Sequence, residues 1–256
     1  KPNFIAKMST YTPFLTALRT LIGAPYVRTG ADALGFHTDE RNRYHLAPLA
    51  VVLPDSVTKI RAIVQLCGEH GIAIIAQGGN TGLVGGCAVL ENTPSIILNL
   101  NRLNQIIAVD TLNQTMMVQA GATLAQVQAA ARAQNLLFPL SLASEDSATI
   151  GGNLATNAGG TQVLRYGNMR DLCLGLEVVL ADGQVLSALN TLRKNNTGYD
   201  LKHLFIGSEG TLGIITQAVL KLYPMPATRQ VALIACHDLT DLLSAFMALR
   251  QNLDAR

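Results

Sequence analysis

The sequence predicts an α+β protein with a small parallel β-α-β lobe and a larger lobe built on an antiparallel sheet. In the first hundred residues, apolar runs alternate with an amphipathic helix, and paired apolar strands with tight turns follow. Hydrophobic residues make up 49% of the 256 residues and charged residues only 14%, which is typical of a well-packed globular chain. A chain of this length can bury one large core or two smaller ones.

The parallel lobe is predicted from two apolar runs that flank a helix. Residues 50–54 ("AVVLP") and 72–76 ("IAIIA") have the pattern of buried strands. Between them, Ser56 is the predicted N-cap and Gly71 the predicted C-terminal stop. The i, i+3, i+4, i+7 spacing of a helical apolar face is formed by Ile60, Ile63, Val64 and Cys67. Residues 95–100 ("SIILNL") add a further buried strand.

The second lobe is predicted to be antiparallel. Residues 106–110 and 115–121 read as paired strands, and residues 174–187 read as a β-hairpin that turns at Asp182-Gly183. An alanine-rich helix over 123–135 begins with a capping box of Thr123 and Gln126. Residues 212–224 form one more strand, which is expected to end at Pro224.

After this strand the pattern restarts with a predicted strand over 231–236 ("VALIAC") and a helix over 239–253. One strand and one helix cannot close a domain, so we expect the chain to be a fragment that ends inside a third module. The apolar stripe of this helix is Leu239, Leu242, Leu243, Phe246 and Leu249. The predicted divisions are an N-terminal helical segment (1–43), a first subdomain (44–103), a second subdomain (104–228) and the truncated start of another domain (229–256).

Composition excludes several functions. A formal net charge of +2 gives no reason to expect nucleic acid or an anionic membrane as a partner. No apolar run is long enough for a transmembrane helix, and the chain start lacks the apolar region of a secretory signal. No G-x-S-x-G motif is present, which disfavours a hydrolase.

The cysteines and histidines show no metal-ligand spacing, so we expect no metal site. The cysteines, expected to be free thiols in a reducing cytoplasm, are Cys67, Cys87, Cys173 and Cys236. The histidines, expected to be surface or structural residues, are His37, His45, His70, His203 and His237.

The stretch "AQGGNTGLVGG" (76–86) holds five glycines and no lysine or arginine. It follows a predicted strand at the sheet edge where α/β proteins bind ligands. Consecutive backbone N–H groups in such a loop can hold phosphate oxygens without cationic side chains, so pyrophosphate is a plausible ligand. The loop matches neither a Walker A motif nor a Rossmann G-x-G-x-x-G. A flexible turn is the alternative.

Two more stretches of small residues follow, "SATIGGNLATNAGG" (147–160) and "IGSEGTLGIIT" (206–216). The first could instead serve close helix packing. The second carries one carboxylate, Glu209. A long dinucleotide needs close backbone approach at several points, so a single shared ligand is the economical interpretation of all three stretches.

These stretches, together with "LRYGNMRDLCLGLEVVLADG", "LRKNNTGYDLKHLF" and "VALIAC", resemble the PCMH-type FAD-binding domain of the vanillyl-alcohol-oxidase superfamily. Within it the motifs are most similar to the D-2-hydroxyglutarate and D-lactate dehydrogenase branch, a group of FAD-linked oxidases. The resemblance covers residues 44–236 in order and spacing. It implies FAD between the two lobes, and it makes the final segment the start of a substrate or cap domain.

The resemblance also implies roles for individual residues. The pyrophosphate would be bound by Gly78, Gly79, Asn80, Thr81 and Gly82, with Gly85 and Gly86 shaping the turn. The isoalloxazine and ribityl chain would be lined by Pro139, Ser144, Thr149, Gly152, Asn153, Thr156, Asn157 and Gly159. The adenosine half would meet Glu209, Gly210 and Ile215. Some superfamily members bond a histidine covalently to the flavin; Asn80 stands at that place, so we expect non-covalent FAD.

The implied reaction is oxidation of a D-2-hydroxy acid to a 2-oxo acid, with hydride transfer to flavin N5. The implied electron acceptor is a quinone, a cytochrome or an electron-transfer flavoprotein. The implied location is cytoplasmic, with peripheral contact to an inner membrane through the acceptor left open, as is a homodimer. The catalytic and substrate-binding groups of the relatives lie in regions beyond this sequence, so the chain alone is expected to be inactive. A structural or solvated role is expected for Arg165, Tyr166, Arg170, Lys194 and Tyr199.

Two alternatives remain. One is an enzyme similar to UDP-N-acetylenolpyruvoylglucosamine reductase, which shares the FAD domain but takes electrons from NADPH. The other is a glycine-rich packing or interaction module without a cofactor or enzymatic activity.

Overall fold

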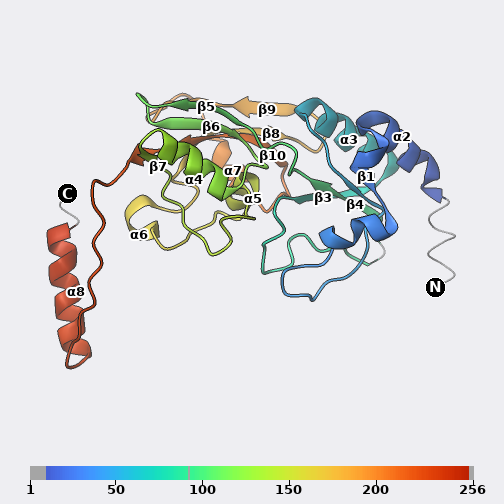
Figure 1. Cartoon of the computed structure of the whole chain (residues 1–256). Coiled ribbons are helices and arrows are strands. Elements are labelled where there is room, and N and C mark those ends of the chain that lie inside the picture. Colours follow the sequence, from blue (N-terminus) through green and yellow to red (C-terminus); the bar gives the residue numbers. More distant parts are fainter. Residues whose placement is uncertain (1–9, 92, 254–256) are drawn as a thin grey trace. The chain divides into compact units, whose positions relative to one another are not determined.

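Two sheets carry the fold, one mainly parallel and one antiparallel (Figure 1), in the computed structural model, which describes residues 10–91 and 93–253. The first sheet has the order β1-β2-β4-β3, in which β2, β4 and β3 are parallel and β1 is antiparallel to β2. Its strands are β1 (Val27–Arg28), β2 (Ala50–Val52), β3 (Ala73–Gln77) and β4 (Ser95–Asn99). The predicted parallel β-α-β unit is therefore confirmed.

Helix α3 (Val57–His70) forms where it was predicted, because both of its ends are satisfied. The Ser56 hydroxyl accepts a hydrogen bond from the N–H of Lys59 at 3.3 Å, and Gly71 takes a left-handed φ of 62°. The apolar face of α3 is buried as predicted, and α2 (Thr12–Ile22) packs beside it. Two 3-10 helices, η1 (Ala24–Tyr26) and η2 (Gly30–Phe36), lie between α2 and β2 in the sequence.

The second sheet has the order β5-β6-β10-β8-β9, and every neighbouring pair is antiparallel. Its strands are β5 (Ile106–Asp110), β6 (Thr115–Gln119), β8 (Cys173–Val179), β9 (Val185–Ala188) and β10 (Ile214–Lys221). The β8–β9 hairpin turns at Asp182-Gly183, as predicted, and Gly183 has a φ of 81°. The predicted antiparallel lobe is confirmed.

Four helices lie between the strands of this sheet in the sequence. Helix α4 begins with the predicted capping box, in which Thr123 and Gln126 exchange side-chain and backbone hydrogen bonds. The helices are α4 (Leu124–Ala133), α5 (Ile150–Ala155), α6 (Val163–Tyr166) and α7 (Lys202–Phe205). A separate two-stranded sheet pairs β7 (Leu136–Leu137) with β11 (Tyr223–Pro224).

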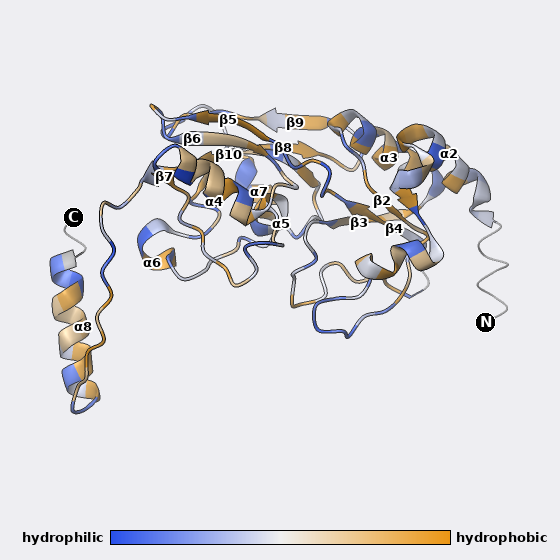
Figure 2. Cartoon of the chain, viewed as in Figure 1, coloured by the Kyte–Doolittle hydropathy of each residue, from blue (hydrophilic) through white to orange (hydrophobic). Residues whose placement is uncertain are grey.

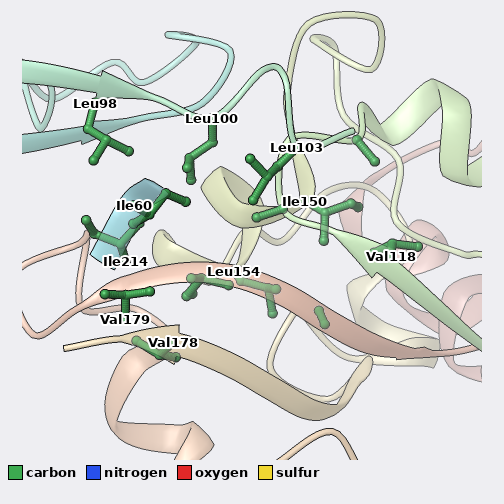
Figure 3. Close-up of a cluster of buried hydrophobic side chains, with 14 of the residues drawn as sticks. Ile60, Leu98, Leu100, Leu103, Val118, Ile150, Leu154, Val178, Val179 and Ile214 are labelled. Atoms are coloured by element: carbon green, nitrogen blue, oxygen red, sulfur yellow. The ribbon is translucent and has the colours of Figure 1, made fainter. Parts of the chain in front are cut away.

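One hydrophobic core joins the two lobes. Ile60 of α3, Leu98 of β4, Val118 of β6 and Ile150 of α5 belong to the same buried cluster (Figure 3). A smaller cluster that includes Val51 and Ile97 covers the opposite face of the first sheet. Burial on both faces explains why β2 and β4 read as uninterrupted apolar runs.

Three strand predictions need correction. The run at 72–76 was expected to be buried, but most of β3 is only half-buried, because β3 is the edge strand of its sheet. The strand predicted over 212–224 breaks after Lys221, and Pro224 lies in β11. Residues 231–236 form no strand, because within the described residues no other strand pairs with them.

The segment 1–43, predicted as helical, holds α2 and the two 3-10 helices from residue 10 onward, and it also contributes β1 to the first sheet. Residues 1–9 lie outside the described residues. The boundaries proposed for this segment and for the two subdomains stay predictions.

Residues 226–256 form a separate unit. Within it, α8 (Leu239–Leu253) forms as predicted, and its apolar stripe is exposed. Figure 2 shows polar and apolar residues alternating along this helix. No helix in the described part of the chain has the length and hydropathy needed to span a membrane.

Two glycines of α3 allow a matched stability test. An added Cβ would have open space at both Gly68 and Gly71, but only Gly71 has a positive φ. We expect Gly68→Ala to raise the free energy of unfolding by roughly 0.5–1 kcal/mol, because Gly68 lies inside a helix. Gly71→Ala should lower it by roughly 1–2 kcal/mol, because the left-handed conformation is strained for alanine. Urea unfolding measures both, and a stability loss in Gly68→Ala would contradict the assignment of α3.

Candidate functional site

The three stretches of small residues meet around one cavity of about 240 Å³. Most of its wall comes from the first glycine loop (76–87), from the segment 142–158 that contains α5, and from residues 209–215, and Asp39 and Leu100 add to it. The structure therefore brings together the three stretches that the sequence analysis assigned to a single ligand.

The first glycine loop has free backbone donors. Within the described residues, none of the backbone N–H groups from Gly79 to Cys87 donates a hydrogen bond. Asn80 and Gly85 take positive φ angles of 56° and 79°. Successive N–H groups can form a concave site for an anion where the backbone changes between negative and positive φ.

A buried amide pair fixes the start of this loop. The Asn99 Nδ2 group donates to Gln77 Oε1 at 3.0 Å and to the carbonyl of Gly78 at 3.1 Å. The Gln77 Nε2 group donates to the carbonyl of Phe36 at 2.7 Å. Both amides are buried at the carboxyl ends of β3 and β4, where a lost partner would leave an unsatisfied polar group.

Residues 36–44, for which no role in the site was predicted, form hydrogen bonds with the same loop. Asn80 Nδ2 donates to the carbonyl of Thr38 at 2.8 Å, and Arg43 Nη2 donates to the carbonyl of Leu83 at 2.6 Å. Asp39 from this segment lines the cavity.

Some glycines of the loop are required by packing. A Cβ on Gly79 would lie 1.8 Å from the Ser147 carbonyl oxygen, and one on Gly78 would lie 2.1 Å from Thr149 Oγ1. In contrast, a Cβ on Gly82 would meet nothing within 4 Å. Close packing thus explains Gly78 and Gly79, but it does not explain Gly82.

The second stretch forms α5 and presents one unsatisfied donor. The Thr149 hydroxyl caps the helix by accepting from the N–H of Gly152 at 3.5 Å. Asn153 lines the cavity with 4% of its surface exposed, and its Nδ2 has no hydrogen-bond partner in the described structure. A buried donor without a partner is costly and suits a site that a ligand completes.

The third stretch joins α5 through the backbone. The N–H of Gly207 donates to the Leu154 carbonyl at 3.0 Å, and the N–H of Glu209 donates to the Ala155 carbonyl at 2.9 Å. Glu209 and Asp39 are the charged residues that line the cavity, and none of its described lining residues is Lys or Arg.

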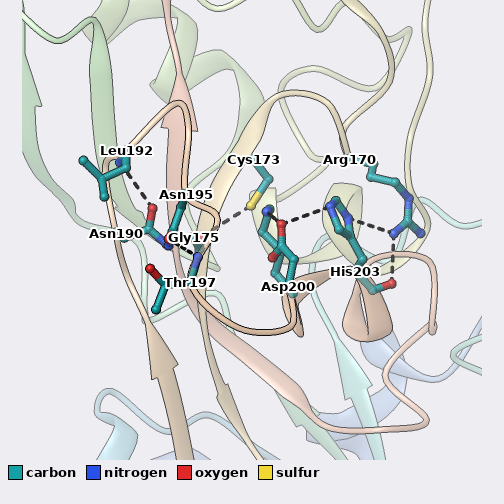
Figure 4. Close-up of polar contacts among 10 residues, drawn as sticks. Arg170, Cys173, Gly175, Asn190, Leu192, Asn195, Thr197, Asp200 and His203 are labelled. Atoms are coloured by element: carbon teal, nitrogen blue, oxygen red, sulfur yellow. Dashed lines mark hydrogen bonds and ion pairs between the residues drawn. The ribbon is translucent and has the colours of Figure 1, made fainter.

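Arg170 anchors the chain that leads into the third stretch (Figure 4). Its backbone N–H donates to Asn157 Oδ1 at 2.9 Å, and its guanidinium donates to the carbonyls of His203, at 2.9 Å, and Ile206. Burial, followed by the charge of Lys202, lowers the pKa of His203, which lies beside this guanidinium. These contacts give Arg170 a structural role.

All but three of the predicted site residues line the cavity. Pro139, which follows Phe138 and precedes Leu140 in the sequence, is buried and does not line the cavity. Asn157 holds Arg170 at a φ of 48°, and Gly159 packs near Val163.

Several lining residues were not predicted. Gln77 lies in the first glycine stretch but was given no role, and Asp39 lies outside all three stretches, because the importance of both comes from contacts between distant segments. The missed residues are Asp39, Ala76, Gln77, Val84, Cys87, Leu100, Leu142, Gly151, Ala155, Ala158, Gly213 and Ile214. The described residues contain no cluster of three or more metal-ligating side chains.

Comparison with known proteins gives a consistent result. Residues 48–188 match the family described as "FAD binding domain". A D-2-hydroxyglutarate dehydrogenase from Xanthomonas citri is 41% identical over 242 residues, which cover 94% of this chain and 51% of that protein. A mitochondrial D-2-hydroxyglutarate dehydrogenase from Bos taurus is 44% identical over 197 residues, which cover 77% of this chain and 36% of that protein. The chain thus spans about half, or less, of the length of these relatives.

Solved structures share the fold. An alkyldihydroxyacetonephosphate synthase superimposes with a TM-score of 0.76 at 27% identity, covering 85% of this chain and 41% of that one. A p-cresol methylhydroxylase superimposes with a TM-score of 0.72 at 26% identity, covering 94% of this chain and 48% of that one.

Gly82 and Gly79 separate ligand binding from packing. We expect Gly82→Ala to keep the stability of the ligand-free protein within roughly 0.5 kcal/mol of the original, while it weakens dinucleotide binding by placing a methyl group in the cavity. Gly79→Ala should destabilise the fold by roughly 2 kcal/mol or more, because its Cβ would collide with a carbonyl oxygen. Thermal unfolding and ligand titration of both variants measure the difference. Unchanged ligand affinity in Gly82→Ala would show that the first glycine loop does not contact the ligand at this position.

Proposed function

This chain belongs to the family of FAD-binding domains, and on that premise we propose that it is the FAD-binding part of an FAD-dependent D-2-hydroxy-acid dehydrogenase. The matches confirm the predicted resemblance and FAD as the cofactor. The observation that supports the proposal most is the cavity itself, because all three predicted stretches line it.

The residues present fit a bound dinucleotide. The free N–H groups of residues 79–87 offer donors to a pyrophosphate, and Asn153 Nδ2 offers a buried donor farther along the cavity. Glycine at position 82 leaves room for the ligand to approach the backbone. The roles implied by the resemblance, with pyrophosphate at 78–82, flavin and ribityl at 144–156 and adenosine at 209–215, are part of this proposal; Pro139, Asn157 and Gly159 lie outside the cavity lining and are left out of it.

Non-covalent attachment is also part of the proposal. Asn80 stands where some superfamily members carry the bonding histidine, and an amide is not a nucleophile toward flavin. In this chain the Asn80 side chain is engaged with the carbonyl of Thr38.

Bound FAD would supply the two-electron oxidation of the substrate carbon. The chain's own residues bind the cofactor, orient it and exclude water through apolar walls such as Leu142 and Ile215. A hydroxy acid needs cations for its carboxylate, and none of the described lining residues is Lys or Arg. The substrate-binding cations and the general base are therefore proposed to lie outside this cavity.

The partners follow the same proposal. The substrate would be a D-2-hydroxy acid such as D-2-hydroxyglutarate, after the names of the relatives. The acceptor would be a quinone, a cytochrome or an electron-transfer flavoprotein, with the protein in the cytoplasm or at the surface of an inner membrane.

Visible absorbance of the purified chain, with and without added FAD, tests the proposal. Flavin bands that move into the supernatant after heat denaturation would support a non-covalent FAD module. Bands that stay with the precipitated protein would contradict non-covalent attachment. A folded protein that stays colourless after FAD addition would favour the packing module, which the close contacts of Gly78 and Gly79 also suit.

Cys87 reports directly on occupancy of the cavity. Burial, and then the charge of Glu209, raise the pKa of this thiol, so its alkylation should be slow at neutral pH and faster as the pH rises. We expect saturating FAD to slow maleimide labelling of Cys87 several-fold further, because the cofactor covers it. Peptide mass spectrometry measures the rates.

Two cysteines serve as internal controls. Burial raises the pKa of both Cys67 and Cys173 to about 12, so both should stay unlabelled with or without FAD. Equal labelling of Cys87 in the presence and absence of FAD would show that the cofactor does not occupy this cavity.

A further inference from the structure

Asp39 places a well-oriented carboxylate in the wall of the cavity. Its side chain is only 7% exposed, and its Oδ1 accepts hydrogen bonds from the backbone N–H groups of Arg43, at 2.5 Å, and Tyr44, at 3.0 Å. Two bonds to one oxygen fix the rotamer of the side chain. The second oxygen, Oδ2, is therefore held in one direction.

Oδ2 lacks a hydrogen-bond donor. No group in the described structure donates to it, although Arg43 Nε forms an ion pair with it at 3.5 Å. Burial alone would raise the pKa of Asp39, but the backbone N–H groups of Tyr44, Arg43 and Arg41, together with the Arg43 guanidinium, hold it below its ordinary value. The group is thus an ionised carboxylate that can only accept hydrogen bonds.

The chemistry of the cavity limits what can face this oxygen. A phosphate is excluded because it is itself anionic and offers no proton at neutral pH. A metal ion lacks further ligands, since no cluster of three ligating side chains occurs in the described residues. A neutral donor, an O–H or N–H group, is left as the match, because a buried acceptor without a donor is costly.

The position of Asp39 beside the proposed pyrophosphate loop points to a sugar hydroxyl of the cofactor. The Thr38 carbonyl, next to Asp39, accepts from the side chain of Asn80 in the proposed pyrophosphate loop. In FAD the groups on either side of the pyrophosphate are sugar chains, and both carry hydroxyls. We propose that Asp39 is a cofactor-binding residue whose Oδ2 accepts a hydrogen bond from a sugar hydroxyl adjoining the pyrophosphate of FAD. This proposal rests on FAD binding in the cavity.

Asp39→Asn tests the proposal with little change in shape. Asparagine keeps an oxygen for the N–H groups of Arg43 and Tyr44, but it replaces the accepting Oδ2 with an NH₂ donor. We expect the FAD dissociation constant, measured by flavin fluorescence, to rise roughly tenfold or more, because the lost bond involves a charged acceptor.

Asp110→Asn is the matched control. Asp110 Oδ1 accepts from the N–H groups of Leu112, at 3.0 Å, and Asn113, at 2.9 Å, in the same manner, but Asp110 is exposed and does not line the cavity. Its FAD affinity should equal that of the original protein. Competition by ADP and by FMN identifies the sugar: weaker ADP binding to Asp39→Asn indicates the ribose, and weaker FMN binding indicates the ribityl chain.

Equal or tighter FAD binding by Asp39→Asn would overturn the proposal, because it would mean that the carboxylate only repels the phosphates. If that variant fails to fold, the original protein is titrated with ADP and 2′,3′-dideoxy-ADP, and with FMN and a flavin alkyl phosphate that lacks ribityl hydroxyls. Weaker binding of either hydroxyl-free ligand supports the proposal, and no loss with both overturns it. Failure of the original protein to bind FAD would defeat the proposed function itself, a separate outcome.

Discussion

The close backbone approach between the two lobes is the constraint on which the site depends. The first glycine loop reaches the segment before α5 so closely that a single methyl group on Gly79 would collide with the Ser147 carbonyl. This contact lies beside a core shared by both sheets. Because the lobes cannot move apart without exposing that core, the cavity walls are held in place by the same burial that stabilises the fold.

The electrostatics of the cavity follow from its small residues. Backbone N–H groups can offer partial positive charge to phosphates without Lys or Arg, and the described lining contains neither. Its two carboxylates, Asp39 and Glu209, come from segments that lie before and after the first loop in the sequence. A ligand that satisfies this cavity must therefore combine an anionic centre with neutral hydrogen-bond donors, as a dinucleotide does.

Local signals allowed much of the fold to be predicted. The caps of α3 and α4 and the Asp182-Gly183 turn are decided by neighbouring residues, so sequence reasoning located them correctly. The strand expected at 231–236 was wrong, because strand formation depends on a partner that the described residues do not provide.

The candidate site was predictable only where it consists of glycine-rich loops. Asp39 and the role of Gln77 were not predicted, because hydrogen bonds across some forty residues of sequence join their segment to the loop. Asn157 was predicted to line the cavity, but its side chain instead accepts a hydrogen bond from the backbone N–H of Arg170. Sequence motifs indicate the residue types of a site, whereas the three-dimensional structure decides which of these residues face the cavity and which support the fold.

The two uses of glycine in the first loop couple folding to ligand binding. Gly78 and Gly79 are needed for contact between the lobes, while Gly82, a few residues along, faces open space in the cavity. A ligand that bridges the first loop and α5 binds only when the lobes are packed, so it stabilises that packing by mass action. Substitutions that disturb this packing would therefore weaken cofactor retention, and loss of cofactor would loosen the interface.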